Sequence, residues 1–276
     1  MKITFIGGGN MATALIAGLA GKLTAGANIH VVDPNPEQLA RLAFDHGVTT
    51  AEHIGEQAGA SDVIVLAVKP QQMRDVAAAL LPQLAAVRPL VLSIAAGIRG
   101  ADLARWLNGH KAIVRTMPNM PALIGQGITG MVAMEGVSNA QKAAADDIMQ
   151  AVGATVWLDD EALIDPVTAV SGSGPAYVFY FIEAMQQAAE ELGLSKEQGK
   201  QLALATFTGA AQLAARSPDE VAVLRERVTS KGGTTYAALT SMEQSGVKQA
   251  IVAAIKAASA RGRELGEQMG KQGPDQ

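Results

Sequence analysis

The sequence contains no cysteine and few aromatic residues, and both absences narrow what the protein can be. Without cysteine there is no disulfide, no thiol nucleophile and no thiolate-bound zinc. The four histidines (His30, His46, His53 and His110) show no metal-binding spacing such as HExxH, so we predict no metal site. Because only 4% of the chain is aromatic, we expect a core of aliphatic residues and alanine.

Long runs of one charge and long apolar runs are also missing. The formal net charge is -4 and no extended basic stretch occurs, so nucleic acid is not an expected partner. No segment approaches the roughly 18 apolar residues of a membrane-spanning helix. The apolar stretch near the N-terminus, residues 3–6, is too short for a secretion signal. We therefore expect a cytoplasmic protein that does not enter a membrane.

The remaining composition is sufficient for two folded domains. Of 276 residues, 49% are hydrophobic and 17% charged, which argues against disorder. In the first half, short apolar runs alternate with helical patterns. The runs are residues 3–6, 29–32, 63–68, 90–94 and 113–116, and the helical patterns are 11–20, 36–46, 73–84 and 100–107. Strands that are apolar throughout are typical of a parallel sheet covered on both faces. This predicts an α/β fold with a Rossmann-type doubly wound sheet over residues 1–158.

Residues 159–276 have a different pattern, which is helical almost throughout. Pro166, Pro175 and Pro218 stand where helices are expected to begin, since proline fits the first turn of a helix. Residues 270–276 are expected to fray. A small alanine-rich helical core favours completion by a second copy, most simply in a homodimer. The alternative is a monomer whose helices pack on the sheet.

A glycine-rich turn follows the first predicted strand. Ile6 is followed by Gly7, Gly8, Gly9, Asn10, Met11 and Ala12, which fits the pattern G-x-G-x-x-A between a strand and a helix. In such a turn, the backbone amides at the start of the helix bind a pyrophosphate. We therefore predict that residues 6–11 bind a dinucleotide cofactor, the alternative being a turn with only a structural role.

Asp33, at the end of the second predicted strand, bears on the choice between NADH and NADPH. A carboxylate there accepts a hydrogen bond from the ribose 2′-hydroxyl and repels a 2′-phosphate. Asn35 could instead bind that phosphate if Asp33 turned away, and Arg41 could also reach it. Asp33 could equally cap the helix that Pro36 opens. Asp33 and Asn35 are both predicted to contact the cofactor, and the choice between NADPH and NADH stays open.

Six segments resemble pyrroline-5-carboxylate reductases, and they occur in the order found in that family. They are residues 7–12 (GGGNMA), 67–70 (AVKP), 93–97 (SIAAG), 115–119 (RTMPN), 171–177 (SGSGPAY) and 228–243, which includes GGTT. The resemblance covers nearly the whole chain.

It implies a Rossmann-type domain followed by an all-helical dimerisation domain, with rings of dimers in some members. It also implies an active site where the nicotinamide meets the helical domain, in some arrangements across the dimer. The implied reaction is reduction of Δ1-pyrroline-5-carboxylate to L-proline by NAD(P)H, the last step of proline synthesis. The iminium form of this substrate is already electrophilic, so positioning carries much of the rate and little acid–base machinery is needed.

Several segments are expected to line the cofactor at the carboxyl ends of strands. Ala67, Val68, Lys69 and Pro70 form one such turn. Lys69 is a tempting catalytic acid, but we favour a role in the cofactor-binding turn. Ala95 and Ala96 are small enough to let the backbone approach the nicotinamide ribose, and Asn119 is the polar group expected beside the nicotinamide.

The substrate is expected at the loop that contains Ser230, Gly232, Gly233, Thr234 and Thr235. Glycines before a helix expose backbone amides that can bind the substrate carboxylate.

By resemblance, the hydroxyl of Thr235 lies nearest the imine nitrogen and is the predicted catalytic group, the alternative being an N-cap. Glu161 aligns with a family carboxylate near the substrate amine, the alternative being a surface loop.

The sequence departs from the family at three places. Residues 52–54 read Glu-His-Ile where the family often has an asparagine that contacts the cofactor. Lys231 replaces a usual proline, and the stretch before Val228 is longer than usual.

Two other functions are less compatible with these residues. A β-hydroxyacid dehydrogenase would need a lysine on the helix predicted over residues 176–191, which has none. A non-catalytic NAD(P)-binding sensor would have no use for the loop at residues 230–235.

Overall fold

The protein consists of two compact units. The computed structural model describes residues 1–84 and 88–271. The first unit is Met1–Ser173 together with Ala258–Gln276, and the second is Gly174–Ala257. A division after residue 158 would fall just beyond strand β8 (Gly153–Trp157), whereas the compact units separate at the start of helix α8 (Gly174–Glu191). Helix α12 (Val247–Lys271) contributes to both units.

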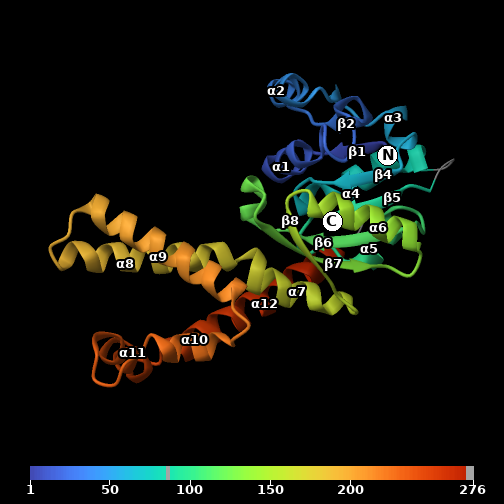
Figure 1. The fold of residues 1–276 in the computed structure, drawn as a ribbon. Coiled ribbons are helices and arrows are strands. Elements are labelled where there is room, and N and C mark those ends of the chain that lie inside the picture. The colour runs from blue at the N-terminus through green and yellow to red at the C-terminus, as the bar shows by residue number, and fades with distance from the viewer. Residues whose placement is uncertain (85–87, 272–276) are drawn as a thin grey trace. The chain divides into compact units, whose positions relative to one another are not determined.

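The first unit contains an eight-stranded sheet in the order β3-β2-β1-β4-β5-β6-β7-β8 (Figure 1). Its other strands are β1 (Ile3–Ile6), β2 (Ile29–Val32), β3 (Thr49–Ala51), β4 (Val63–Leu66), β5 (Leu90–Ser93), β6 (Ile113–Met117) and β7 (Gly127–Ala133). Neighbouring strands are parallel except β6 and β7, and Ile3 of β1 pairs with both Ile29 and Val63. This confirms the predicted doubly wound sheet. Strand β3 was not predicted, and the run predicted to end at Val68 leaves the sheet after Leu66.

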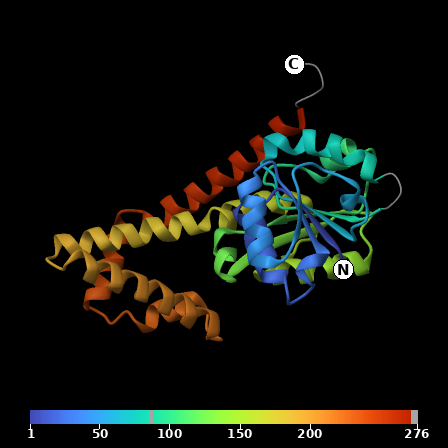
Figure 2. The same cartoon turned by 90° about the horizontal axis from the view of Figure 1, so that it is seen from above.

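Helices cover both faces of this sheet (Figure 2). One hydrophobic cluster contains residues of α1 (Asn10–Leu19), α2 (Pro36–His46) and α6 (Asn139–Gln150). A second contains residues of α3 (Glu56–Gly59), α4 (Met73–Leu84) and α5 (Gly100–Trp106). Successive residues of β1 enter different clusters, Phe5 the first and Ile6 the second. Because both faces are buried, the central strands carry apolar residues toward both faces, and their few polar residues, such as Thr4 of β1 and His30 of β2, are buried too.

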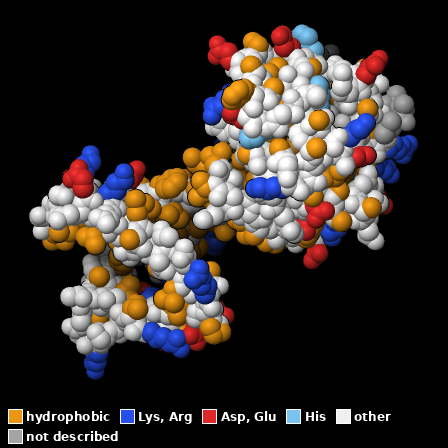
Figure 3. Space-filling model, turned by 45° about the horizontal axis from the view of Figure 1, so that its top comes forward, with side chains coloured by type: hydrophobic (Ala, Val, Ile, Leu, Met, Phe, Trp, Pro, Cys, Tyr) orange, Lys and Arg blue, Asp and Glu red, His pale blue; other side chains and the backbone are white. Residues whose placement is uncertain are grey.

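The second unit is all-helical over its described residues, as predicted. It consists of α8, α9 (Lys196–Arg216), α10 (Val221–Arg227), α11 (Thr234–Gln244) and the beginning of α12. Helices α8 and α9 pack together, with the rings of Phe181 and Phe207 6.5 Å apart. Many large apolar side chains on the second unit are exposed, among them Tyr180 (73%), Leu202 (55%) and Leu213 (59%). Hydrophobic side chains gather over these helices (Figure 3).

Two of the three predicted helix starts at proline are confirmed. Pro166 lies in the single turn of α7 (Ile164–Val167), and Pro175 is the second residue of α8. The prediction for Pro218 was wrong, because α10 begins only at Val221 and Pro218 lies in the preceding loop. At the C-terminus, α12 continues through Lys271, and the remaining residues predicted to fray lie outside the described residues. No helix in the described part of the chain is long and apolar enough to cross a bilayer.

A buried histidine lies on β2. The Nδ1 atom of His30 is 2.9 Å from the hydroxyl of Thr49, which donates in turn to the carbonyl of Ile29. Nδ1 thus shares a hydrogen bond with this hydroxyl, and the buried Nε2 has no hydrogen-bond partner in the described structure. Because burial disfavours the charged ring, it lowers the pKa of His30 below its ordinary value.

Candidate active site

The glycine turn after β1 packs closely against the ends of β2 and β4, where the Gly7 amide donates to the carbonyl of Val32. Gly7 has a φ of +100°, and a Cβ atom there would lie 2.6 Å from the carbonyl oxygen of Ala67, so the position requires glycine. Gly9 is the N-cap of α1 and has no side chain to cap the helix. A Cβ atom at Gly9 would meet nothing within 4 Å, so the space before the helix is open to a ligand. These features fit a pyrophosphate held by the amides that begin α1.

Beside this turn is a cleft of about 650 Å³, within the size range of small-molecule sites. It lies at the carboxyl ends of β1, β2 and β4, where open α/β sheets bind ligands. Of the residues predicted to bind the cofactor, the cleft is lined by Ile6, Gly7, Gly9, Asp33, Ala67, Val68 and Lys69. Glu52, His53 and Ile54, where the sequence departs from the family, also line it. The cleft therefore fits part of a dinucleotide, and it brings together seven of the fifteen residues predicted to contact the cofactor.

The other predicted cofactor residues do not line this cleft. Asn10 and Met11 begin α1, and Gly8 donates its backbone N–H to the Asp33 carboxylate at 2.7 Å. Asn35 caps α2, its Oδ1 accepting from the amides of Glu37 and Gln38. Pro70 opens the 3₁₀ turn η2 (Pro70–Gln72), whose N-cap is Lys69. Ala95 and Ala96 follow β5, and Ala95 is buried.

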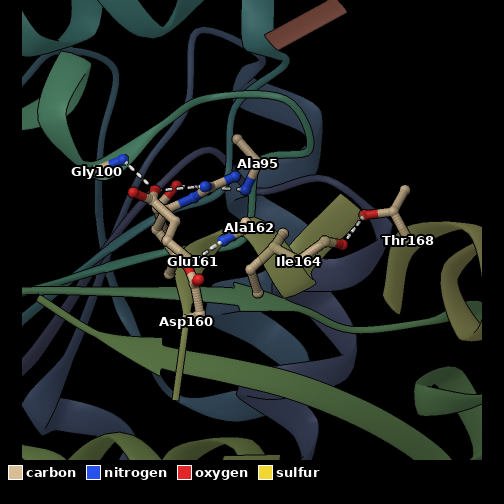
Figure 4. A network of polar contacts seen from close by, with 9 residues as sticks. Ala95, Gly100, Asp160, Glu161, Ala162, Ile164 and Thr168 are labelled. Carbon is tan, nitrogen blue, oxygen red and sulfur yellow. Dashed lines mark hydrogen bonds and ion pairs between the residues drawn. The ribbon is translucent and has the colours of Figure 1, made fainter. Parts of the chain in front are cut away.

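Glu161 makes a network with β6 and α5 (Figure 4). It opens the 3₁₀ turn η4 (Glu161–Leu163), and its Oε1 accepts from the amide of Gly100 at 2.6 Å and from the guanidinium of Arg115. The Arg115 side chain is only 6% exposed and that of Glu161 is 26% exposed. The carboxylate thus pairs with a buried cation and fixes the first residue of α5.

Asn119 connects two segments. Its Nδ2 donates to the carbonyl of Ser171 at 3.2 Å, and its Oδ1 accepts from the amide of Ile128 at 3.0 Å. Ser171 belongs to the π-helical turn η5 (Thr168–Gly172), which precedes α8. The amide of Asn119, predicted to face the nicotinamide, therefore holds the segment before α8 against β7.

The predicted substrate loop lies in the second unit. Gly232 has a φ of +73°, and Gly233 is the N-cap of α11 with no side chain bonded to the helix start. The helix therefore begins with amides that no side chain caps, as an anion site requires. Thr234 and Thr235 are the first two helical residues. Since Gly233 is the N-cap, Thr235 does not serve that purpose, which removes its main alternative role.

Two residues of the first unit, Arg115 and Gln38, hold the site together but were assigned no role from the sequence. Arg115 belongs to the buried strand β6, and a charged residue within an apolar run was the signal that a partner was needed. The Gln38 amide donates to the carbonyl of Gly8 at 2.7 Å and to the hydroxyl of Thr13 at 3.1 Å, so it ties α2 to the glycine turn. Nothing in the local sequence distinguishes Gln38 from a solvent-facing helix residue.

Comparison with known proteins supplies the context for these two sites. Residues 161–265 match the family model for pyrroline-5-carboxylate reductase dimerisation, and residues 2–97 match the model for coenzyme F420-dependent NADP oxidoreductases. A pyrroline-5-carboxylate reductase of Pseudomonas aeruginosa is 48% identical over 272 residues, which are 98% of each chain. The chain belongs to the pyrroline-5-carboxylate reductase family.

Solved structures agree with this assignment. A pyrroline-5-carboxylate reductase from Coxiella burnetii matches with a TM-score of 0.90 and 40% identity, covering 96% of this chain and 98% of that one. A pyrroline carboxylate reductase from Plasmodium falciparum, solved with NADP bound, matches with a TM-score of 0.85 and 30% identity at the same coverage. The match to pyrroline-5-carboxylate reductases thus includes both the cofactor cleft and the loop before α11.

Proposed function

We propose that this protein reduces Δ1-pyrroline-5-carboxylate to L-proline with hydride from NADPH or NADH, the last step of proline synthesis. The observation that carries this proposal is the 48% identity to a pyrroline-5-carboxylate reductase over 98% of the chain, a span that covers the glycine turn after β1 and the glycine loop before α11. A β-hydroxyacid dehydrogenase or a non-catalytic sensor would not account for both.

The reaction consumes the imine, one NAD(P)H and one proton, and it yields proline and NAD(P)⁺. When bound, the cofactor supplies the hydride, which adds to the imine carbon. We propose that the amides at Gly232 and Thr234 bind the substrate carboxylate, with Ser230 and Gly233 beside them, since the Gly233 amide donates to the carbonyl of Ser230 within the loop. Each charge-assisted bond of this kind contributes about 1.5–3 kcal/mol.

The hydroxyl of Thr235 would hydrogen-bond the ring nitrogen and hold it in place while its carbon accepts hydride. Since the imine becomes strongly electrophilic on protonation, holding it in line accounts for much of the rate.

For the first unit, we propose that the open N-terminus of α1 binds the pyrophosphate and that the turn at Ala67–Pro70 lines the dinucleotide. Ala95, Ala96 and Asn119 belong to the predicted nicotinamide end. We further propose that Glu161 acts without touching the substrate. Its bonds to Arg115 and Gly100 fix the end of the loop over residues 94–99, which begins with the predicted nicotinamide contacts.

The proposal is tested by initial rates of imine-dependent NAD(P)H oxidation, and in reverse by proline-dependent reduction of NAD(P)⁺ at alkaline pH. Thr235→Ala is the informative variant and Thr235→Ser its matched control, because serine keeps the hydroxyl. Turnover that needs the hydroxyl supports the assignment. A protein that binds cofactor but shows no turnover in either direction would instead be the sensor considered above.

We propose that the enzyme is at least a homodimer, since residues 161–265 match a dimerisation family and the second unit exposes many large apolar side chains. Light scattering after size exclusion tests this, because the monomer has a mass of 28.4 kDa. A ring of dimers would give a higher multiple. The cytoplasmic location and the absence of nucleic-acid and membrane partners remain predictions from composition.

A further inference from the structure

The carboxylate of Asp33 is held at the end of β2 by two backbone amides. One oxygen, Oδ2, accepts from the amide of Gly8 at 2.7 Å, and Oδ1 accepts from the amide of Asn35 at 2.9 Å. Asp33 therefore does not turn away from the glycine turn, and it lines the cleft. In a doubly wound sheet this position faces the adenosine ribose of the dinucleotide.

Polar side chains after β2 are committed to other contacts. The Oδ1 atom of Asn35 accepts from the amides of Glu37 and Gln38, and the amide of Gln38 donates to Gly8 and Thr13. Arg41 lies 3.6 Å from Asp45, and its side chain is 73% exposed. Of the two groups that the sequence offered for a 2′-phosphate, Asn35 thus caps α2 and Arg41 points to solvent beside Asp45.

The charge of the cleft is also unfavourable for a phosphate. The carboxylates of Asp33, Glu52 and Asp75 line it, and among the described lining residues Lys69 is the one lysine or arginine. Lys69 lies in the turn after β4, on a different strand from Asp33. A 2′-phosphate beside Asp33 would bring like charges together in a concave site, which weakens binding.

We infer that this enzyme selects NADH over NADPH and that Asp33 determines the choice. The inference rests on the proposed function for its use in turnover, and on the cleft alone for binding. One relative was solved with NADP bound, and the inference concerns only the residues that this chain places at the end of β2. Asp33 accepts a hydrogen bond from the ribose 2′-hydroxyl of NADH and repels the phosphate that NADPH carries on that 2′-oxygen.

The test compares kcat/KM for NADH and NADPH at saturating imine, in the wild type and in Asp33→Asn. Asparagine keeps an oxygen for the Gly8 amide and removes the charge. We expect the wild type to favour NADH by on the order of tenfold or more, and Asp33→Asn to lower that ratio by a similar factor, mainly through a lower KM for NADPH. Asp147→Asn, which removes the same charge from an exposed position on α6 outside the cleft, is the matched control and should change the ratio by less than about threefold.

A wild-type enzyme that prefers NADPH or treats both cofactors alike would overturn the inference. So would an Asp33→Asn variant with an unchanged ratio and an unchanged melting temperature. Titration of nicotinamide fluorescence gives dissociation constants for both cofactors without turnover. If no imine is reduced, the proposed function fails, and the two constants still decide which cofactor the cleft selects.

Discussion

Replacing Glu161 by glutamine would separate a role in fixing the cofactor unit from a role in binding substrate. The substitution removes the negative charge that pairs with Arg115, a guanidinium that is 6% exposed on β6. Breaking a buried ion pair from one side typically costs about 3–5 kcal/mol, because the other charge stays buried and unpaired. Since Glu161 is 26% exposed, water offsets part of that cost, and we expect a loss of about 2–3 kcal/mol.

The two tryptophans make this loss measurable. Trp106 is the last residue of α5, the helix whose first residue donates its amide to Glu161, and Trp157 is the last residue of β8. Both therefore report on the unfolding of the first unit. Urea unfolding followed by their fluorescence should show a midpoint lower by roughly 1 M, given slopes of about 1–3 kcal/mol per molar urea. Glu264→Gln is the matched control. Its partner is Arg261, both side chains are more than half exposed, and the expected change is below about 1 kcal/mol.

A second variant and a kinetic measurement complete the test. Arg115→Met combined with Glu161→Gln removes both charges and should recover most of the lost stability. If Glu161→Gln matches the wild type in urea but raises KM for the imine, Glu161 binds substrate and the positioning role is refuted. If stability falls while KM for the imine holds, the carboxylate acts through Arg115 and Gly100.

Four further substitutions, one of them a control, test other parts of the structure. Thr235→Ala should lower turnover on the order of 10- to 100-fold with cofactor affinity unchanged, since one bond to the reacting centre is lost; an unchanged rate would remove Thr235 from the mechanism. Gly7→Ala should abolish cofactor binding in a titration, because its Cβ would lie 2.6 Å from the carbonyl of Ala67. Gly21→Ala is the control: Gly21 has a φ of +75° and open space around the added Cβ, so the substitution should cost only about 1–2 kcal/mol of backbone strain and leave cofactor binding intact. If both variants bind the cofactor equally well, the close approach of Gly7 to Ala67 is unimportant. The lowered pKa of His30 means that the unfolded chain takes up the proton first, so stability is full above about pH 6.5 and falls as the pH drops through the lowered pKa. In urea unfolding between about pH 7 and 5, the free energy of unfolding of His30→Val should therefore fall less as the pH drops than that of the wild type. An unchanged pH dependence of this free energy would exclude His30 as its source.

The strands and helices of the first unit were predictable because their signals are local. Helix α2 was expected over Pro36–His46 and has those bounds, since Asn35 caps its start and Gly47, with a φ of +65°, ends it. Strand β3 was missed because three residues at the exposed edge of the sheet, Thr49–Ala51, carry no apolar run. The helix start expected at Pro218 failed because proline also suits a loop.

The candidate site was predictable only in part, because some of its contacts join residues far apart in sequence. The glycine turn and the end of β4 share a cleft, as the motif and strand order implied. The bonds from Glu161 to Arg115 and Gly100 join residues 46 and 61 positions apart, and no spacing rule connects them. The direction of the Asp33 carboxylate depends on the amides of Gly8 and Asn35, so the sequence alone did not decide between NADH and NADPH.

The return of α12 to the first unit sets an order for folding during synthesis. The carbonyl of Gly270 accepts from Arg105, Glu267 pairs with Arg99, and Met269 packs against the cluster beneath α5. Domains generally fold from the N-terminus as they leave the ribosome. Here the nucleotide-binding unit cannot complete its fold until the end of α12 has been translated, because residues 258–271 cover part of its surface. A nascent chain that stalls before α12 would therefore expose the hydrophobic surface against which Met269 packs, and chaperones bind such surfaces.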